Sequence, residues 1–271
     1  MEFIFKKVDS EELLKEIYRV RYEVYCQECG FLPASAYPDG LEIDEFDEHS
    51  IHFAAFADGN VIGTSRLVMN SEHGYPLNDH CKEISVNESE LPKDGLVEVS
   101  RLALRKSFRR RQEDGIYAVE SYLKKSEGGI LAENPEDRTD QERKRHQPVV
   151  ILGLYKAMYH ETRRVGFTHW YAAMEKKLWY ALKTFNFTFQ EIGPQVDYYG
   201  PVIPYLGVIE QLEKEVSGNS PGLWAYFLEG LEEQYWPESM RPATEQPLTT
   251  EQPLTTEKPL TTEKPLATEK P

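Results

Sequence analysis

The sequence has few cysteines, no long apolar run and fewer basic than acidic side chains. Its 271 residues include only Cys26, Cys29 and Cys81, an odd and sparse set that argues against a disulfide framework and fits reduced thiols. No stretch approaches the roughly 18 consecutive apolar residues that a membrane span requires. The start, MEFIFKKVDSEELL, lacks the basic-then-apolar layout of a secretory signal. We therefore expect a cytoplasmic protein without a membrane span.

The sparse cysteines also argue against a metal or redox centre. Cys26-Gln-Glu-Cys29 has suitable spacing, but the pair falls at the end of an expected helix, and no second cysteine pair completes a tetrahedral site. Cys81 has no activating base near it in sequence, so we do not expect it to act as a nucleophile. We expect no metal and no tightly bound cofactor.

Basic side chains are outnumbered overall but cluster locally. The 31 Lys and Arg residues against 46 Asp and Glu residues give a formal charge of -15, which argues against general nucleic-acid binding. Five basic residues nevertheless fall within seven positions, Arg105-Lys106-Ser107-Phe108-Arg109-Arg110-Arg111. This run is the one place where we expect an acidic partner to dock.

Regular proline spacing marks the C-terminal end of the chain. From Thr244 the sequence becomes a near-perfect six-residue repeat of the type TEQPLT and TEKPLT. Proline at every sixth position forbids a continuous helix, and one leucine per repeat cannot build a core. We expect a folded domain over 1–240, with an insertion at about 112–147, and a disordered tail over 241–271.

The apolar pattern of the domain alternates between helical and strand periods. A helix is expected to open at Asp9-Ser10-Glu11-Glu12, with Asp9 as its cap, and its apolar stripe runs from Leu13 to Val24. Two strands, 51–56 and 61–68, flank the turn Asp58-Gly59-Asn60. Further strands are expected over 97–104, 167–174 and 185–192, and helices over 149–165 and 175–184. This order predicts an α/β (α+β) fold in which helices cover a mixed sheet.

Charged residues gather at three places that such a sheet can bring together. Glu42-Ile43-Asp44-Glu45-Phe46-Asp47 precedes the hairpin, Arg66 lies on it, and Glu98-Val99-Ser100-Arg101 lies on the next strand. Arg21 interrupts the apolar stripe of the first helix, where a charge needs a partner. The expected ion pairs therefore join Arg21, Arg66 and Arg101 to Glu42, Asp44, Asp47 and Glu98.

Two interpretations of these charges stay open at this point. One is a structural salt-bridge network that fixes the first helix against the sheet. The other is a pocket in which a carboxylate with a raised pKa accepts a proton from a nucleophile. Strand alternation puts Glu98 and Ser100 on one face and Arg101 on the other unless a bulge intervenes. His49 and His52, beside the acidic motif, could aid proton transfer, but on a strand edge we expect them to be ordinary surface residues.

The charged motifs resemble a known family when taken in order. Arg21-x-x-x-Tyr25, Phe31, Glu42-x-Asp44-x-x-Asp47, Gly63-x-x-Arg66 and Glu98-x-Ser100-Arg101 resemble the signature of the acyl-homoserine-lactone (autoinducer) synthases, which are GNAT-fold enzymes. That family usually has Phe and Trp where Tyr25 and Phe31 stand. Longer segments such as VIGTSRLV, VEVSRLAL and VDYYGPVIPYL resemble exosortase (PEP-CTERM) system-associated acyltransferases and, more distantly, long-chain N-acyl amino acid synthases.

The resemblance covers roughly residues 15 to 230 and implies a fold and an activity. It implies a GNAT-like, mostly antiparallel sheet flanked by helices, and an N-acyltransferase that moves a long-chain fatty acyl group to the amine of an amino acid or related small molecule. In this fold the acyl thioester, here a co-substrate, lies in a splay between the two central strands and the amine attacks it directly. Glu98 and Glu42 are the candidate bases that accept the amine proton. The candidate substrate-binding residues are Arg21, Asp44, Asp47, Arg66, Ser100 and Arg101.

The segment after the third strand indicates the type of thioester. Acetyl-coenzyme A users of this fold have a glycine-containing turn there that binds pyrophosphate, whereas residues 105–111 contain no glycine. This favours an acyl carrier protein as donor over coenzyme A, and a basic run suits an acidic carrier. The candidate donor-binding residues are Leu102, Ala103, Leu104, Arg105, Lys106, Arg109, Arg110 and Arg111.

Three alternatives remain from the sequence. The basic run fits a solvated loop as well as a docking site. The whole chain fits a non-catalytic GNAT-fold module that binds an acyl carrier or a lipid. A nucleic-acid binder that uses residues 105–111 is disfavoured by the acidic field around them.

Overall fold

The computed structural model describes residues 2–108 and 147–241. The predicted insertion, from its start to residue 146, and the predicted tail from residue 242 lie outside the described residues.

The cap of the first helix lies one residue later than expected. After strand β1 (Phe3–Lys7), helix α1 spans Glu11–Tyr22 and continues as a π-helical turn, Glu23–Glu28. Ser10 caps α1, since its Oγ accepts a hydrogen bond from the backbone N–H of Leu13 at 3.3 Å, so the assignment of Asp9 was wrong.

The predicted hairpin and the strand after it are confirmed. Strands β2 (Ser50–Ala57) and β3 (Asn60–Met69) pair antiparallel around Asp58 and Gly59, whose φ angles of 47° and 81° suit a tight hairpin turn. A short helix, α2 (Pro76–His80), precedes strand β4 (Leu96–Leu104).

The C-terminal half contains more elements than the pattern predicted. Helix α4 (Gln147–Val165) ends at Gly166, with φ +92°, and is followed by β5 (His169–Met174) and α5 (Lys176–Thr184), as expected. The expected strand 185–192 is reduced to β6 (Gln190–Glu191). The remaining elements were not predicted: β7 (Val196–Asp197), β8 (Pro201–Val208), α6 (Ile209–Asn219) and α7 (Pro221–Leu228).

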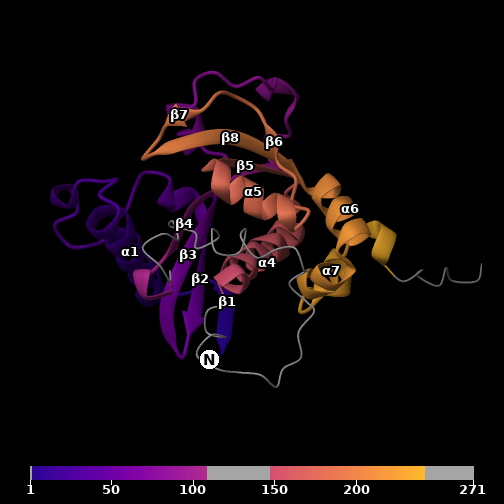
Figure 1. Ribbon diagram of the computed structural model, residues 1–271, viewed down its shortest axis with the longest axis horizontal. Coiled ribbons are helices and arrows are strands. Elements are labelled where there is room, and N and C mark those ends of the chain that lie inside the picture. The colour runs from indigo at the N-terminus through magenta and orange to yellow at the C-terminus, as the bar shows by residue number, and fades with distance from the viewer. Residues whose placement is uncertain (1, 109–146, 242–271) are drawn as a thin grey trace, which may run out of the picture.

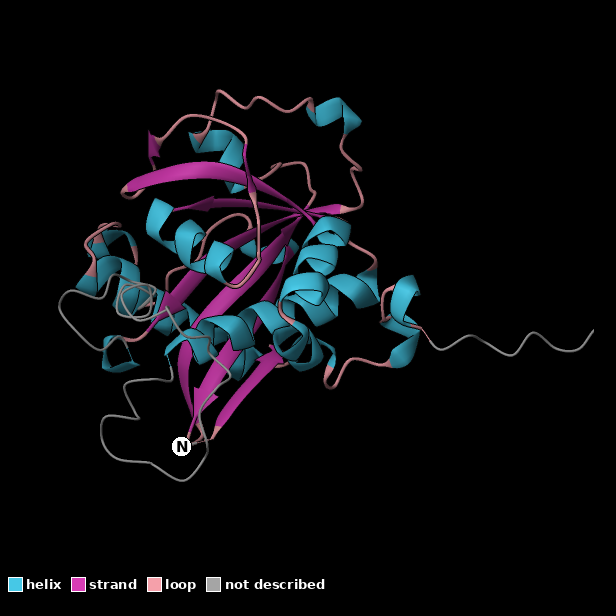
Figure 2. Cartoon of the chain, turned by 45° about the vertical axis from the view of Figure 1, so that its right-hand side comes forward, coloured by secondary structure: helices cyan, strands magenta, loops and turns pink. Residues whose placement is uncertain are grey.

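The strands form one twisted sheet between helices (Figures 1 and 2). Its order is β1-β2-β3-β4-β5-β8-β6, with β7 also paired to β8, and among the described strands only β4 and β5 run parallel. On β2, Ala54 packs with α1, whereas Phe53 and Ala55 pack in the core beneath α4. The two helices therefore cover opposite faces, which confirms the predicted mixed, mostly antiparallel sheet flanked by helices.

The two parallel central strands stay together only at their beginnings. Residues Leu96–Glu98 of β4 pair with His169–Tyr171 of β5, and the remaining residues of both strands separate. The gap between them opens toward Leu104 and Met174 and gives the sheet the splay expected of the GNAT fold. Within the two described ranges, no helix combines the length and the apolar character that a membrane crossing needs.

Candidate active site

A bulge in β4 brings Ser100 and Arg101 into the same cluster. Arg101 has φ +51°, a conformation rare for a residue with a side chain, and the pairing of β4 with β3 shifts opposite it between Thr64 and Arg66. The Nε–H of Arg66 donates to Ser100 Oγ at 3.0 Å. The Nη2 of Arg101 donates to Asp44 at 2.8 Å. The bulge thus overrides the strand alternation that would have separated these two side chains.

Three arginines and three carboxylates form a buried ionic cluster beneath α1. Arg21 donates to Asp47 at 2.6 and 3.0 Å, and also to Glu42. Arg66 donates to Asp44 at 2.6 and 2.8 Å and also to Asp47. Arg101 joins the two halves, because its Nη2 contacts Glu42 at 3.0 Å as well as Asp44. We call these six residues the ionic cluster.

The ionic cluster holds its carboxylates in the charged form. Burial alone raises the pKa of a carboxyl, but Arg21 and Arg101 outweigh it at Glu42 and hold that pKa below its ordinary value. Burial is likewise outweighed at Asp47, by Arg21 and Arg66, and the pKa of Asp47 falls well below its usual range. Arg21, Arg66 and Glu42 are each 0% exposed, so their charges are stabilised by one another and not by water.

Glu98 lies outside this cluster. Its expected ion pair with one of the three arginines is not formed within the described residues, and that prediction was wrong. Glu98 Oε2 instead accepts a hydrogen bond from the backbone N–H of Leu77, at the start of α2, at 2.8 Å. Glu98 is 1% exposed, and burial raises its pKa to about 7 against the lowering effects of that hydrogen bond and of the nearby arginines.

A cleft runs through the gap between β4 and β5, and Glu98 lines it. This β4–β5 cleft holds about 770 Å³ of space not filled by atoms, its open mouth included. Its lining includes the polar side chains Glu98, Ser100, Arg101, Tyr198 and Tyr199. We define its apolar part as the lining residues that belong to the core on the α4 side, Leu102, Tyr155, Ala172, Met174 and Leu178. A carboxyl with a pKa near neutrality therefore borders a cleft whose lining includes polar side chains and an apolar part.

The predicted donor-binding residues separate in the structure. Leu102 lines the cleft, and its carbonyl accepts a hydrogen bond from the Tyr25 hydroxyl at 3.1 Å. Ala103 packs toward α1 and Leu104 into the core on the α4 side. Arg105 is ion-paired to Glu23 at 2.8 Å, and the backbone N–H of Lys106 contacts Glu28 at 3.4 Å. Arg109, Arg110 and Arg111 lie outside the described residues.

Several residues at the site were missed from the sequence. The Tyr198 ring lies in the cleft and stacks on His80 with centroids 3.7 Å apart. Neither residue carries a spacing signal, although VDYYG includes Tyr198. His52 is not on the surface as expected: it is 7% exposed, and burial lowers its pKa to about 4, so the ring is neutral at pH 7.

Cys81 is buried, at 2% exposed. Burial raises the pKa of Cys81 to about 11, which keeps it a neutral thiol. Within residues 2–108 and 147–241, no three or more His, Cys, Asp or Glu side chains are grouped so that they could hold a metal ion.

Comparison with known proteins identifies the fold. Residues 20–116 match the model of the acetyltransferase (GNAT) domain. The AHL synthase LasI superposes with a TM-score of 0.55 at 14% identity, over 80% of this chain and 95% of LasI. BjaI is a CoA-dependent acyl-homoserine lactone synthase solved with SAM and isopentyl-CoA. It superposes with a TM-score of 0.52 at 14% identity, over 84% of this chain and 89% of BjaI. MesI, another CoA-dependent acyl-homoserine lactone synthase, superposes with a TM-score of 0.52 at 18% identity, over 79% of this chain and 95% of MesI. The expected GNAT fold is confirmed.

Proposed function

We propose that this GNAT-fold acyltransferase moves a long-chain fatty acyl group from an acyl carrier protein thioester to the amine of an amino acid or related small molecule, with Glu98 as the general base. The observation that carries the proposal is Glu98 itself. Its carboxyl lines the β4–β5 cleft, outside the ionic cluster, and has its pKa raised to about 7. A base is most effective when its pKa is near the working pH.

The cleft supports direct attack of an amine on a thioester. An amine with a pKa near 8 is mostly protonated at neutral pH, so it must lose a proton before or during attack on the carbonyl. Glu98 would accept that proton, directly or through water, as the new C–N bond forms and the thiolate leaves. Backbone N–H groups of β4, where it separates from β5, would stabilise the developing oxyanion.

Glu42 is the weaker of the two candidate bases. Its oxygens are engaged by Arg21 and Arg101, and its pKa is lowered, so it holds a proton poorly at neutral pH. We assign Glu42, with Asp44 and Asp47, to holding the arginines in place. Arg66 positions Ser100, and Arg101 borders the acceptor side of the cleft.

The alternative of a non-catalytic binding module has a structural signature of its own. It would place Glu98 and Glu42 both in ion pairs deep in the sheet, with no channel between them. Only Glu42 is paired in this way, and Glu98 faces the cleft. This difference supports catalysis over simple binding.

The donor is proposed from the sequence. BjaI and MesI are CoA-dependent synthases, so likeness to them does not select a carrier protein. The glycine-free basic run 105–111 supports one. A cytoplasmic location and an association with exosortase systems remain predictions from the sequence.

Mass spectrometry of lipid extracts tests the activity as a whole. Cells that overexpress the chain should accumulate an N-acyl product absent from cells with an empty vector, and its mass reveals acyl group and acceptor together. Extracts that match the empty-vector control, with the protein folded and abundant, would contradict the proposed activity.

Reversal of basic charges tests the carrier-protein donor. Arg109, Arg110 and Arg111 should be changed to Glu together, whereas Arg105 should be left alone because it is paired with Glu23. With an acyl carrier protein donor, kcat/KM should fall about tenfold or more at low salt and lose its salt dependence, and kcat should change little. Lys214→Glu, on the exposed side of α6, is the matched control.

The same acyl group on coenzyme A completes this comparison. Wild-type enzyme should prefer the carrier-protein thioester, and the triple reversal should leave the coenzyme A reaction unchanged. Equal use of both donors, with neither affected by the reversal, would identify the basic run as a solvated loop.

A further inference from the structure

The apolar part of the β4–β5 cleft is bordered by the ring of Tyr155, on helix α4. Tyr155 is 1% exposed and lines the cleft. Its ring centroid lies 6.0 Å from that of Trp170 and 6.0 Å from that of Phe187. Neither Trp170 nor Phe187 lines the cleft, and both line a second cavity.

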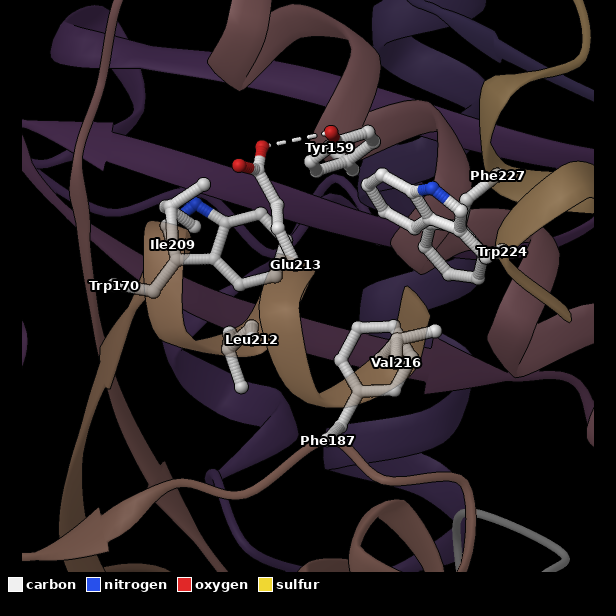
Figure 3. A pocket seen from close by; sticks show the side chains of 9 residues that line it. All are labelled: Tyr159, Trp170, Phe187, Ile209, Leu212, Glu213, Val216, Trp224 and Phe227. Atoms are coloured by element: carbon white, nitrogen blue, oxygen red, sulfur yellow. Dashed lines mark hydrogen bonds between the residues drawn. The ribbon is translucent and has the colours of Figure 1, made fainter. Parts of the chain in front are cut away.

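This second cavity lies between α4, α6 and α7, and Figure 3 shows its nine side chains. Its free volume is only about 10 Å³, about the space that one water molecule needs. Most of its lining is hydrocarbon, from side chains such as Leu212, Val216 and Phe227. Its carboxylate, Glu213, is turned to the Tyr159 hydroxyl, which donates to it at 2.8 Å. The side chains that line this second cavity therefore pack closely and leave no room for an alkyl chain.

Strand alternation on β5 directs the apolar part of the cleft toward Tyr155. Ala172 and Met174 belong to the core on the α4 side, together with Tyr155, whereas Tyr171 and Ala173 pack on the opposite face of the sheet. Glu98 accepts a hydrogen bond from the backbone N–H of Leu77, and the Leu77 side chain also packs on that opposite face. An acyl group whose carbonyl lies near Glu98 would therefore extend through the gap toward α4 and meet the Tyr155 ring.

Resting on the proposed function, we propose that Tyr155 sets the length of the acyl chain that the enzyme transfers. Its ring borders the cleft with the Trp170 and Phe187 rings packed against it, so a chain that reaches it can extend no further. Tyr155→Ala adds the volume of the ring to the cleft and leaves Trp170 and Phe187 as the new end of it. Burial of a methylene stabilises by about 0.8 kcal/mol, which is about fourfold in affinity. Two further methylenes should then shift the ratio of longer to shorter products by on the order of tenfold.

The test is competition among a fixed mixture of saturated acyl thioesters of graded length, with the full chain and the acceptor identified in cell extracts. Products are quantified by mass spectrometry. Tyr155→Ala should shift the distribution of acyl chain lengths among the products to longer chains. Tyr155→Phe keeps the ring and should give the wild-type distribution. Ala172→Val adds bulk to the same part of the cleft and should move the distribution to shorter chains.

Melting curves decide which variant is informative. If Tyr155→Ala is folded and its distribution equals that of wild type, the proposal is overturned. If Tyr155→Ala does not fold, Ala172→Val carries the test, and an unchanged distribution in that variant overturns the proposal equally. Absence of any N-acyl product from wild type would instead contradict the proposed function, so the two failures are distinguishable.

Discussion

Glu98→Gln should reduce the turnover of acyl transfer by about a hundredfold or more, as loss of a general base does. The substitution keeps the shape of the side chain, and a glutamine oxygen can still accept the hydrogen bond from Leu77. Glu161→Gln is the matched control, because Glu161 is a buried carboxylate on α4 that pairs with Lys7 outside the cleft. Turnover of Glu98→Gln within a few-fold of wild type would remove Glu98 from the mechanism.

The melting temperature of Glu98→Gln shows whether a loss of turnover reflects a lost base or a lost structure. The pKa of Glu98 is about 7 in the folded protein against 4.5 ordinarily, so the folded state binds the proton more tightly than the unfolded state. On account of this group, the free energy of unfolding of wild type is highest below about pH 4.5. It falls by up to about 3 kcal/mol as the pH rises through 7. Glu98→Gln lacks this loss, so its melting temperature should exceed that of wild type at pH 8 and approach it near pH 4.5.

Asp47→Asn should lower the free energy of unfolding by roughly 3 to 5 kcal/mol, because it leaves Arg21 and Arg66 buried with too little opposite charge. In a domain of this size that corresponds to a drop of about 10 °C in melting temperature. Glu232→Gln is the control: its partner Arg164 lies at the surface, and such pairs contribute less than about 1 kcal/mol.

The contribution of Asp47 to stability depends on pH in the opposite direction to that of Glu98. The pKa of Asp47 is lowered in the folded state, so its contribution is complete above the ordinary aspartate pKa near 4 and declines as the pH falls below it. The gap between wild type and Asp47→Asn should therefore be widest from pH 6 to 8 and narrow in acid. A melting temperature for Asp47→Asn equal to that of wild type at pH 7 would show that the cluster does not stabilise the fold.

The hairpin and the ionic cluster could be predicted from the sequence because both have local signals. Asp58-Gly59 requires positive φ angles that only a few residues tolerate, and the motif around Glu42 places carboxylates at fixed spacings before the hairpin. Arg21 could be assigned a partner because an unpaired charge on an apolar stripe is costly. In each case the physical requirement lies within a few residues of chain.

Features that depend on distant contacts were missed or misassigned. Phe185, Phe187 and Phe189 alternate as a strand would, but β8 occupies the edge of β5, so these rings pack into the core from a loop. Strand β8 itself contains Pro201 and Pro204, which weaken a strand pattern.

The separation of Glu98 from the ionic cluster likewise has no sequence signal. It depends on the bulge at Arg101 and on a backbone N–H at the start of α2, 21 residues earlier in the chain. The raised pKa, and with it the choice between the two candidate bases, could therefore be read only from the three-dimensional arrangement.

The pH profile of acyl transfer by wild type and Glu98→Gln, measured side by side, tests the role of Glu98 most directly. For wild type, kcat/KM should rise about tenfold per pH unit in acid and bend near pH 7, where Glu98 loses its proton. The residual rate of Glu98→Gln should lack that bend and follow only the titration of the amine acceptor. Profiles of the same shape and height in both proteins would contradict the assignment of Glu98 as the base.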